Sequence, residues 1–213
     1  MRYNPILHAR RSVRLPAYYY AQPGAYYLTI CAHQRRCLFG VVNDGRVGLT
    51  RIGEIVAEEW LQSCQVRPEV TLDAWVIMPN HVHGVIFVGA HGDAPPPLGL
   101  RWPDTRNGGT RSPAGDVNGR AHCHAPLHRQ ARSLASLVGG FKGAVTRRVN
   151  VLRNTPGAPV WQGGYHEHVI RDEPELHDIR LYIPRNPSQW ETDIENPRFR
   201  SVMGQRARKP GQS

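Results

Sequence analysis

The sequence has few cysteines, and nothing in their spacing would organise them. Its four cysteines show no C-x-x-C pair and no dense framework. We therefore expect reduced thiols, as in a cytoplasmic protein. Long apolar runs are also missing, because no stretch approaches a membrane span and the N-terminus has no signal-peptide hydrophobic region. These absences predict a soluble protein of the cytoplasm.

Acidic residues are scarce in three segments. Residues 101–153 hold ten Arg or Lys but only two Asp, whereas residues 1–20 hold four Arg and residues 198–209 hold five basic residues, both without an acid. The formal net charge of the whole chain is +10, so the remaining residues are net acidic. Basic segments around such a body favour a phosphate polymer as partner, with merely solvated tails as the alternative.

The length of 213 residues favours one domain with loose segments attached. Residues 89–132 contain six Pro and seven Gly, a fraction at which a segment no longer packs, so we expect a disordered basic insertion. The domain then comprises residues 25–88 and 133–196. A basic arm (1–24) precedes it, and a frayed basic tail (197–213) follows.

Two groups outside this domain contain the types of residue that form binding sites. The N-terminal arm places three arginines before three tyrosines, a combination that holds phosphates and stacks bases: Arg10, Arg11 and Arg14 before Tyr18, Tyr19 and Tyr20. The insertion carries a metal-like cluster made of His122, Cys123, His124 and His128. A segment without apolar support does not hold ligands in a fixed geometry, so we expect no metal site there.

Apolar periodicity and turn residues predict alternating strands and helices. The expected elements are a strand (25–32), a hairpin around Asn43-Asp44-Gly45, a helix capped by Thr50 and ending near Gln62, two strands (70–78 and 81–88), a helix capped by Ser133, a strand (160–171) and a helix (174–187). On the first helix we expect Glu54, Glu58 and Glu59 to face water. On the second, a buried stripe runs along one side: Leu134, Leu137, Val138, Phe141, Val145 and Val149.

The stretch Asp73–Val88 organises the rest of the chain. Two apolar strands meet at Pro79-Asn80, a pair suited to a tight turn. Residues two apart in a strand project from the same face, so His81 and His83 direct two imidazoles toward one point. Two neutral imidazoles supply two thirds of a facial metal site.

The last predicted helix offers partners for that pair. At 100° per residue, Tyr182 and Asn186 lie on one flank of its buried stripe, and Pro184 between them kinks the last turn. A second H-x-H pair, His166 and His168 around Glu167, lacks a turn-defined entry. We interpret this second pair as structural or as support for the first.

These motifs resemble a known family. The segments that carry the likeness are MPNHVHG (78–84), WQ…YHEHVIR (161–171) and LYIPRNPSQW (181–190), with weaker similarity in YYLTICAHQRRCLFG (26–40) and FKGAVTRR (141–148). Together they resemble the REP-associated tyrosine transposases, which belong to the single-tyrosine HUH transposases. The likeness covers residues 25–88 and 133–190.

The resemblance implies a fold, a reaction and its residues. The fold is α+β, a ferredoxin-like (RRM-like) antiparallel sheet with helices packed on it and the HUH motif on a central strand. A divalent metal, Mg²⁺ or Mn²⁺, is held by His81, His83 and Asn186. Tyr182 attacks single-stranded or hairpin DNA (REP-like palindromes), forms a 5′-phosphotyrosine and later rejoins the strands.

For contact with that DNA we name six basic residues: Arg10, Arg11, Arg14, Lys142, Arg147 and Arg148. Such an enzyme is cytoplasmic and nucleoid-associated when bound to DNA. Both homodimers and monomers occur among its relatives, so the oligomeric state is open. The DNA target, the cleavage position, the preferred metal and the role of the insertion also stay open.

One departure and three alternatives accompany this reading. Insertion-sequence relatives have Gln four residues after the tyrosine, whereas this chain has Asn186, whose amide oxygen also suits a hard cation. A relaxase-like enzyme would use a tyrosine before the HUH motif, at 18, 19, 20, 26 or 27. A non-catalytic binder of hairpin or single-stranded DNA, or a metal-dependent hydrolase without a role for Tyr182, are the others.

Overall fold

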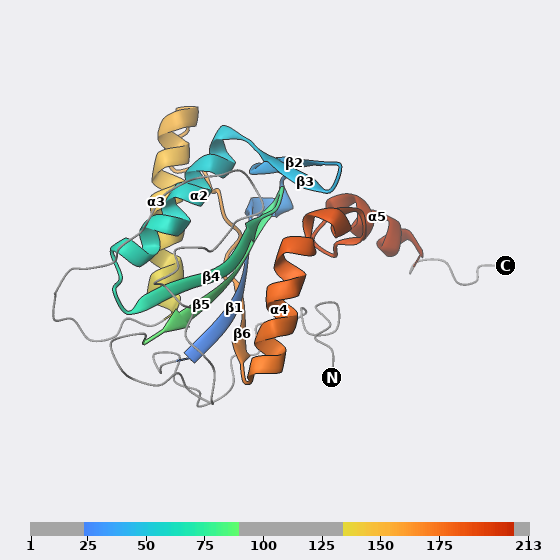
Figure 1. Ribbon diagram of the computed structural model, residues 1–213. Coiled ribbons are helices and arrows are strands. Elements are labelled where there is room, and N and C mark those ends of the chain that lie inside the picture. The colour runs from blue at the N-terminus through green and yellow to red at the C-terminus, as the bar shows by residue number, and fades with distance from the viewer. Residues whose placement is uncertain (1–23, 90–133, 207–213) are drawn as a thin grey trace.

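The computed structural model describes residues 24–89 and 134–206 (Figure 1). Residues 1–23, 90–133 and 207–213 lie outside this range, and with them the cluster at residues 122–128 of the predicted insertion. In chain order the elements are β1 (Gly24–Cys31), η1 (His33–Arg35), β2 (Gly40–Asn43), β3 (Arg46–Leu49), α2 (Arg51–Gln65), β4 (Val70–Ile77), β5 (His81–Val88), α3 (Leu134–Arg153), β6 (His166–Ile170), α4 (Glu173–Arg185), η4 (Pro187–Thr192) and α5 (Pro197–Arg206).

A four-stranded antiparallel sheet in the order β4-β5-β1-β6 forms the centre of the molecule. Taken with α2 and α3, this is the β-α-β-β-α-β arrangement of the ferredoxin-like fold. The strand β5, which begins at His81, is central, lying between β4 and β1. The predicted α+β fold is therefore confirmed, including the place of the H-x-H motif.

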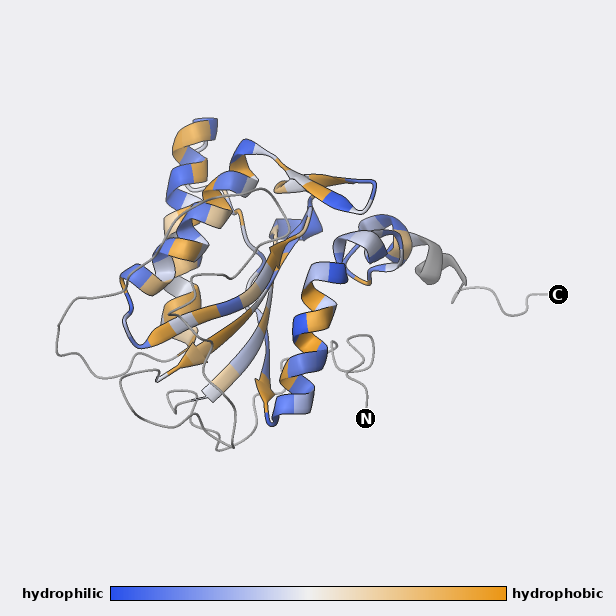
Figure 2. Ribbon diagram, in the orientation of Figure 1, coloured by the Kyte–Doolittle hydropathy of each residue, from blue (hydrophilic) through white to orange (hydrophobic). Residues whose placement is uncertain are grey.

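Helices cover both faces of the sheet: α2 and α3 lie on one side and α4 on the other (Figure 1). Hydrophobic and hydrophilic segments alternate along α2, α3 and α4 (Figure 2), and buried apolar residues of these helices pack against the strands. The stripe predicted for α3, from Leu134 to Val149, is buried throughout. Alternation along β5 supplies both faces, with Val82 and Ile86 in the core under α2 and α3 and Val85 and Phe87 in the core under α4.

Local signals explain how the chain enters these elements. Asp44 and Gly45 adopt positive φ angles of 49° and 70°, as a two-residue hairpin turn between β2 and β3 requires. Thr50 caps α2, because its Oγ1 accepts a hydrogen bond from the Gly53 N–H at 3.1 Å. A Cβ on Gly53 would lie only 1.9 Å from the Phe39 carbonyl oxygen, so this crossing of helix and loop requires glycine.

The structure corrects three boundaries. The predicted strand 160–171 is shorter, because only His166–Ile170 pairs with β1, and Trp161 forms an isolated bridge to Ala32. The α2 helix continues to Gln65, where the backbone N–H of Val66 still bonds to the Gln62 carbonyl. Residues Pro197–Arg206, expected to fray, form α5, whose first turn is held by the Asn196 carbonyl.

No helix among the described residues is both long and apolar enough to cross a membrane.

Candidate active site

The two histidines of β5 lie on the face of the sheet that α4 covers. The tight turn before them is closed by a hydrogen bond from the Met78 N–H to the His81 carbonyl at 2.8 Å. Both imidazoles are buried, and their ring centroids are 4.4 Å apart. Asp193, from the loop after η4, completes a group in which one donor atom of each residue lies within 4.8 Å of the others. These three residues could bind a metal ion.

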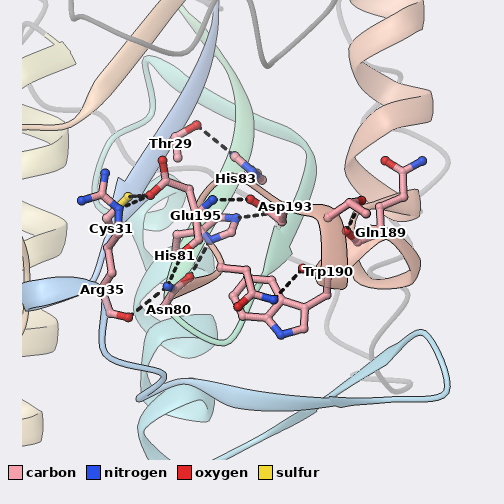
Figure 3. A network of polar contacts seen from close by, with 12 residues as sticks. Thr29, Cys31, Arg35, Asn80, His81, His83, Gln189, Trp190, Asp193 and Glu195 are labelled. Atoms are coloured by element: carbon pink, nitrogen blue, oxygen red, sulfur yellow. Dashed lines mark hydrogen bonds and ion pairs between the residues drawn. The ribbon is translucent and has the colours of Figure 1, made fainter. Parts of the chain in front are cut away.

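Asn80 orients the His81 ring (Figure 3). The Asn80 amide nitrogen donates to the carbonyls of Arg35 and Glu195, at 3.0 Å and 2.8 Å, so its oxygen faces the His81 Nδ1 at 2.8 Å. Because that oxygen only accepts, Nδ1 carries the proton and Nε2 keeps its lone pair. Burial, followed by the nearby His83, holds the pKa of His81 well below its usual value, so the ring stays neutral.

Hydroxyl groups on β1 hold His83 in a similar way. Its Nδ1 lies 2.8 Å from the Tyr27 hydroxyl and 2.9 Å from the Thr29 hydroxyl. In the tautomer whose Nδ1 carries the proton and donates to one of these oxygens, Nε2 is the nitrogen left for a cation. Burial lowers the pKa of His83 to about 3, against a smaller opposing effect of a hydrogen bond to the Leu28 backbone. Both histidines therefore have the neutral form that binds metals.

Asp193 faces His81 without forming a hydrogen bond to it. The Asp193 Oδ2 lies 3.8 Å from the His81 Nε2. Two ligands that each lie about 2.1 Å from one ion are separated by roughly 3 to 4.2 Å, so this spacing suits a shared cation. Burial raises the pKa of Asp193 to about 6, because no charged partner compensates the loss of water.

Three buried atoms at this site have no hydrogen-bond partner among the described residues: His81 Nε2, Asn186 Oδ1 and Asp193 Oδ2. Buried polar atoms are almost always paired, since leaving one unpaired costs about 1 to 3 kcal/mol. The His81 nitrogen and the Asp193 oxygen lie 3.8 Å apart, and they are the kinds of donor atom that a divalent cation binds. The residues present therefore match the predicted cofactor class.

Tyr182 lies beside the metal-binding group. Its ring centroid is 5.8 Å from that of His83 and 6.5 Å from that of Tyr27. Its hydroxyl shares a hydrogen bond with the Asn186 side chain, one helical turn later. Because Asn186 Oδ1 has no partner, the amide nitrogen makes this contact. Burial, and next the charge of Asp193, raise the pKa of Tyr182, so the phenol is protonated at neutral pH.

Two prolines bring these residues together. Pro184 lies inside α4, and the Asn186 N–H bonds to the Ile183 carbonyl at 3.2 Å as the helix ends. Pro187 then starts η4, which returns the chain toward the sheet and places Trp190 with its ring centroid 6.2 Å from that of His81. Asp193 follows directly after η4. The end of α4 thus marks the place where the chain folds back over the histidines.

The second H-x-H pair supports the site and is not part of the metal-binding group. His168 Nε2 lies 2.7 Å from the Glu175 carboxylate, which joins β6 to α4. His166 lies close enough to lower the pKa of His83 slightly. Asp73 on β4 accepts a hydrogen bond from Arg180 at 2.7 Å and also anchors α4, two residues before Tyr182.

The basic residues of α3 lie on the opposite face of the sheet from the histidines. Arg148 pairs with Glu58 and Glu59 of α2, so these two glutamates are ion-paired instead of simply facing water. The Lys142 ammonium donates to the carbonyls of Gln162, at 2.9 Å, and Gly164. Arg147 is exposed. Arg10, Arg11 and Arg14 lie outside the described residues.

Sequence reasoning missed two members of the site. Asn80 has the sequence signature of a turn residue, and its hydrogen bonds to distant carbonyls have no sequence signal. Asp193 follows η4 without a motif or periodicity, and only the return of the chain after Pro187 brings it to His81. Its place seven residues after Asn186 in the chain was the one available hint.

Two solved structures are similar to this chain, whereas no model of a protein family matches it. A solved structure of a REP-associated tyrosine transposase bound to a REP hairpin is similar, with a TM-score of 0.48, 18% identity and coverage of 81% of this chain and 71% of that chain. A candidate transposase from Deinococcus radiodurans R1 has a TM-score of 0.35 and 17% identity, over 78% of this chain and 92% of that chain.

Fold and site together define an α+β protein with a ferredoxin-like sheet and a buried His-His-Asp group that could hold a metal. Over 194 residues the sequence is 34% identical to an uncharacterized protein of Haemophilus influenzae, covering 90% of this chain and 96% of that protein. The chain belongs to the same family as this Haemophilus protein.

Proposed function

We propose that this protein is a transposase-like DNA strand-transfer enzyme that uses Tyr182 as nucleophile and a divalent metal, Mg²⁺ or Mn²⁺, as cofactor. One observation carries the proposal: the partly buried phenol of Tyr182 lies against His83 and Asn186, beside donor atoms that have no partner among the described residues. The sequence likeness to single-tyrosine HUH transposases supports the same assignment. We propose a single catalytic domain, residues 25–88 and 133–196, acting in the cytoplasm on nucleoid DNA.

The proposed roles follow from the donor atoms. His81 Nε2, His83 Nε2 and Asn186 Oδ1 would hold the cation, which supplies Lewis-acid stabilisation of a phosphate and favours the tyrosinate. Asn186 also donates from its amide nitrogen to the Tyr182 oxygen, which fixes the direction of attack.

In the proposed step, the Tyr182 oxygen forms a bond to phosphorus and the bond from phosphorus to the 3′-oxygen breaks. Tyr182 loses its proton and the leaving 3′-oxygen gains one, so the step is balanced in protons. The product is a 5′-phosphotyrosine and a free 3′-hydroxyl. The reverse reaction joins strands without an external energy source, because the phosphotyrosine conserves the bond energy.

The proposed substrate is single-stranded or hairpin DNA with REP-like palindromes. We propose that Arg147, Lys142 and Arg148 on α3, together with the arginines of the N-terminal arm, contact its backbone. Arg147 is exposed, whereas Lys142 and Arg148 have partners within the protein that the DNA would have to replace. A homodimer or a monomer is compatible with this arrangement.

A suicide oligonucleotide tests the proposal. Inverted repeats flanking the gene supply candidate substrates, each nicked downstream of the cleavage position so that the covalent product cannot rejoin. With Mn²⁺ present, we expect a protein–DNA adduct on a denaturing gel, and none with Tyr182→Phe. An adduct formed by Tyr182→Phe would overturn the assignment, and peptide mapping would then identify the tyrosine used, as for a relaxase-like enzyme.

The alternative is a DNA-binding protein without catalysis. It would bind hairpins equally well with and without metal and cleave none of them. The unpaired donor atoms at the site argue against it, because a binding surface gains nothing from unpaired buried polar atoms.

A further inference from the structure

Asp193 is the one charged member of the metal-binding group. Its side chain is only 5% exposed, and its Oδ2 points toward the His81 Nε2 at 3.8 Å (Figure 3). The other oxygen, Oδ1, accepts a hydrogen bond from the Glu195 N–H at 2.7 Å. The carboxylate is therefore held in place through one oxygen, while the other has no partner among the described residues.

The negative charge of Asp193 lacks a counterion in the described part of the protein. Among the described residues, His81 alone lies within ion-pair distance of Asp193, and its ring is neutral because it is buried. The guanidinium of Arg35 pairs with Glu195. A buried carboxylate without a cation is unfavourable, whereas a divalent ion between Asp193 and His81 would compensate it.

Glu195 holds both sides of this arrangement. Its backbone N–H bonds to Asp193, its carbonyl accepts from Asn80, and its carboxylate pairs with Arg35 (Figure 3). Asn80 in turn orients His81. One residue thus sets the position of a strand ligand and of the loop carboxylate, so the spacing between them is built into the fold.

We propose that Asp193 is an anionic fourth donor of this site, so that a divalent cation links the central strand β5 to the segment η4–α5. The inference rests on the proposed metal site and adds to it. Three neutral donors leave a divalent ion with its full double charge, whereas Asp193 reduces the net charge to +1 and tightens binding. Binding of the cation also secures the C-terminal segment against the sheet.

Mn²⁺ alone, added to the full chain, tests the proposal by calorimetry. Asp193→Asn keeps the shape and the Oδ1 acceptor but removes the charge, and we expect its Mn²⁺ affinity to fall about 100-fold. Glu191→Gln is the matched control, because Glu191 is exposed on η4 and loses the same charge. The control should bind Mn²⁺ within about twofold of the wild type.

Thermal melting separates a ligand from a structural residue. In EDTA, Asp193→Asn should melt at or above the wild-type temperature, since it removes an uncompensated buried charge. Mn²⁺ at a concentration that just saturates the wild type should raise its melting temperature and slow its amide exchange in η4 and α5, and both changes should be much smaller in Asp193→Asn.

The outcomes are distinct. Wild-type Mn²⁺ affinity in Asp193→Asn, or equal destabilisation of this variant with and without Mn²⁺, would overturn the role of Asp193 as a ligand. Neither result bears on Tyr182, whose covalent adduct is measured separately at saturating metal. If the adduct never forms but Asp193→Asn loses Mn²⁺ binding, the strand-transfer proposal fails, whereas the assignment of Asp193 as the fourth donor is upheld.

Discussion

The two faces of the central sheet bury different kinds of side chain. Under α2 and α3 the strands meet mainly apolar and aromatic residues, with Trp60 packed edge-on against Phe141 at 5.2 Å between centroids. Under α4 the same strands bury His81, His83 and Asn186 as well. Apolar packing on the first face stabilises the fold, and this stability offsets the cost of burying polar donors on the second face.

Alternation along β5 lets neighbouring residues serve the two faces. Val82 packs under α2 and α3, whereas His83 belongs to the site. Gly84 faces Trp60 so closely that a Cβ would lie 2.4 Å from the indole ring. The apolar face is therefore packed without spare room, which fixes the strand that positions the histidines.

The largest contrast should come from two neighbouring substitutions in β5. His83→Ala removes a proposed metal ligand, and we expect adduct formation with the suicide oligonucleotide to fall by about 10⁴-fold or more. Val82→Ala removes apolar volume from the other face, and we expect a loss of about 2 kcal/mol of unfolding free energy with near-normal adduct yield in the folded protein. Comparable adduct formation by the two variants would show that the face with the histidines is no more important for the reaction than the apolar face.

Trp60→Ala tests the apolar face directly. Removing this buried indole should lower the unfolding free energy by about 3 to 5 kcal/mol, measured by urea denaturation in EDTA. Mn²⁺ affinity at low temperature, where the variant is folded, should stay within a fewfold of wild type, because the indole does not touch the donors. A loss of Mn²⁺ affinity greater than a fewfold in the folded variant would mean that packing on the apolar face affects the metal site on the other face.

Asn80→Ala is expected to have a smaller effect on the metal site. Without its oxygen the His81 ring loses the hydrogen bond that fixes its tautomer, and we expect Mn²⁺ affinity to fall about 10- to 100-fold. Asn150→Ala, which removes an amide that bonds to the Ala158 carbonyl at the far face, serves as control. Equal Mn²⁺ affinity in both variants would contradict the positioning role of Asn80.

The smallest effect concerns acid stability. Burial lowers the pKa of His83 to about 3, whereas an unfolded histidine takes up a proton near pH 6.5. The unfolded state then binds more protons below pH 6.5, so the unfolding free energy falls toward acid by up to about 1.4 kcal/mol per pH unit. Replacing His83 with Gln should flatten this slope in urea titrations between pH 7 and pH 5.

Asp193 opposes this trend, and its contribution has to be removed. Its pKa is raised to about 6, so protonation favours the folded state as the pH falls through that value. We therefore compare Asp193→Asn with the double variant Asp193→Asn/His83→Gln in EDTA. Identical slopes would show that His83 is not held neutral in the folded protein.

Much of the fold was predictable because it depends on short-range patterns. The two apolar strands around Pro79-Asn80, the Thr50 cap, the Asp44-Gly45 turn and the stripe on α3 all have local physical causes, and the structure confirms them. The errors lie at ends, where no periodic signal remains. In the segment before β6, Val160 and Trp161 have strand-like side chains, yet only one bridge forms, to Ala32.

The candidate site was partly predictable for the same reason. His81 and His83 share a face because strand side chains alternate, and Tyr182 and Asn186 share a flank because they are one helical turn apart. Their hydrogen bond supports that placement. Arg148 illustrates the limit, since its position on a basic helix face suggested DNA, whereas α2 supplies Glu58 and Glu59 as its partners.

By itself, the sequence determined which residues share a face within each element, because side-chain direction follows from the backbone period. Only the tertiary structure decided which faces meet. It brought Asp193 to His81 and set Asn80 between two distant carbonyls, and it occupied Arg148 with acids from another helix. Contacts between segments far apart in the chain depend on how the sheet and helices pack together, and no local period encodes them.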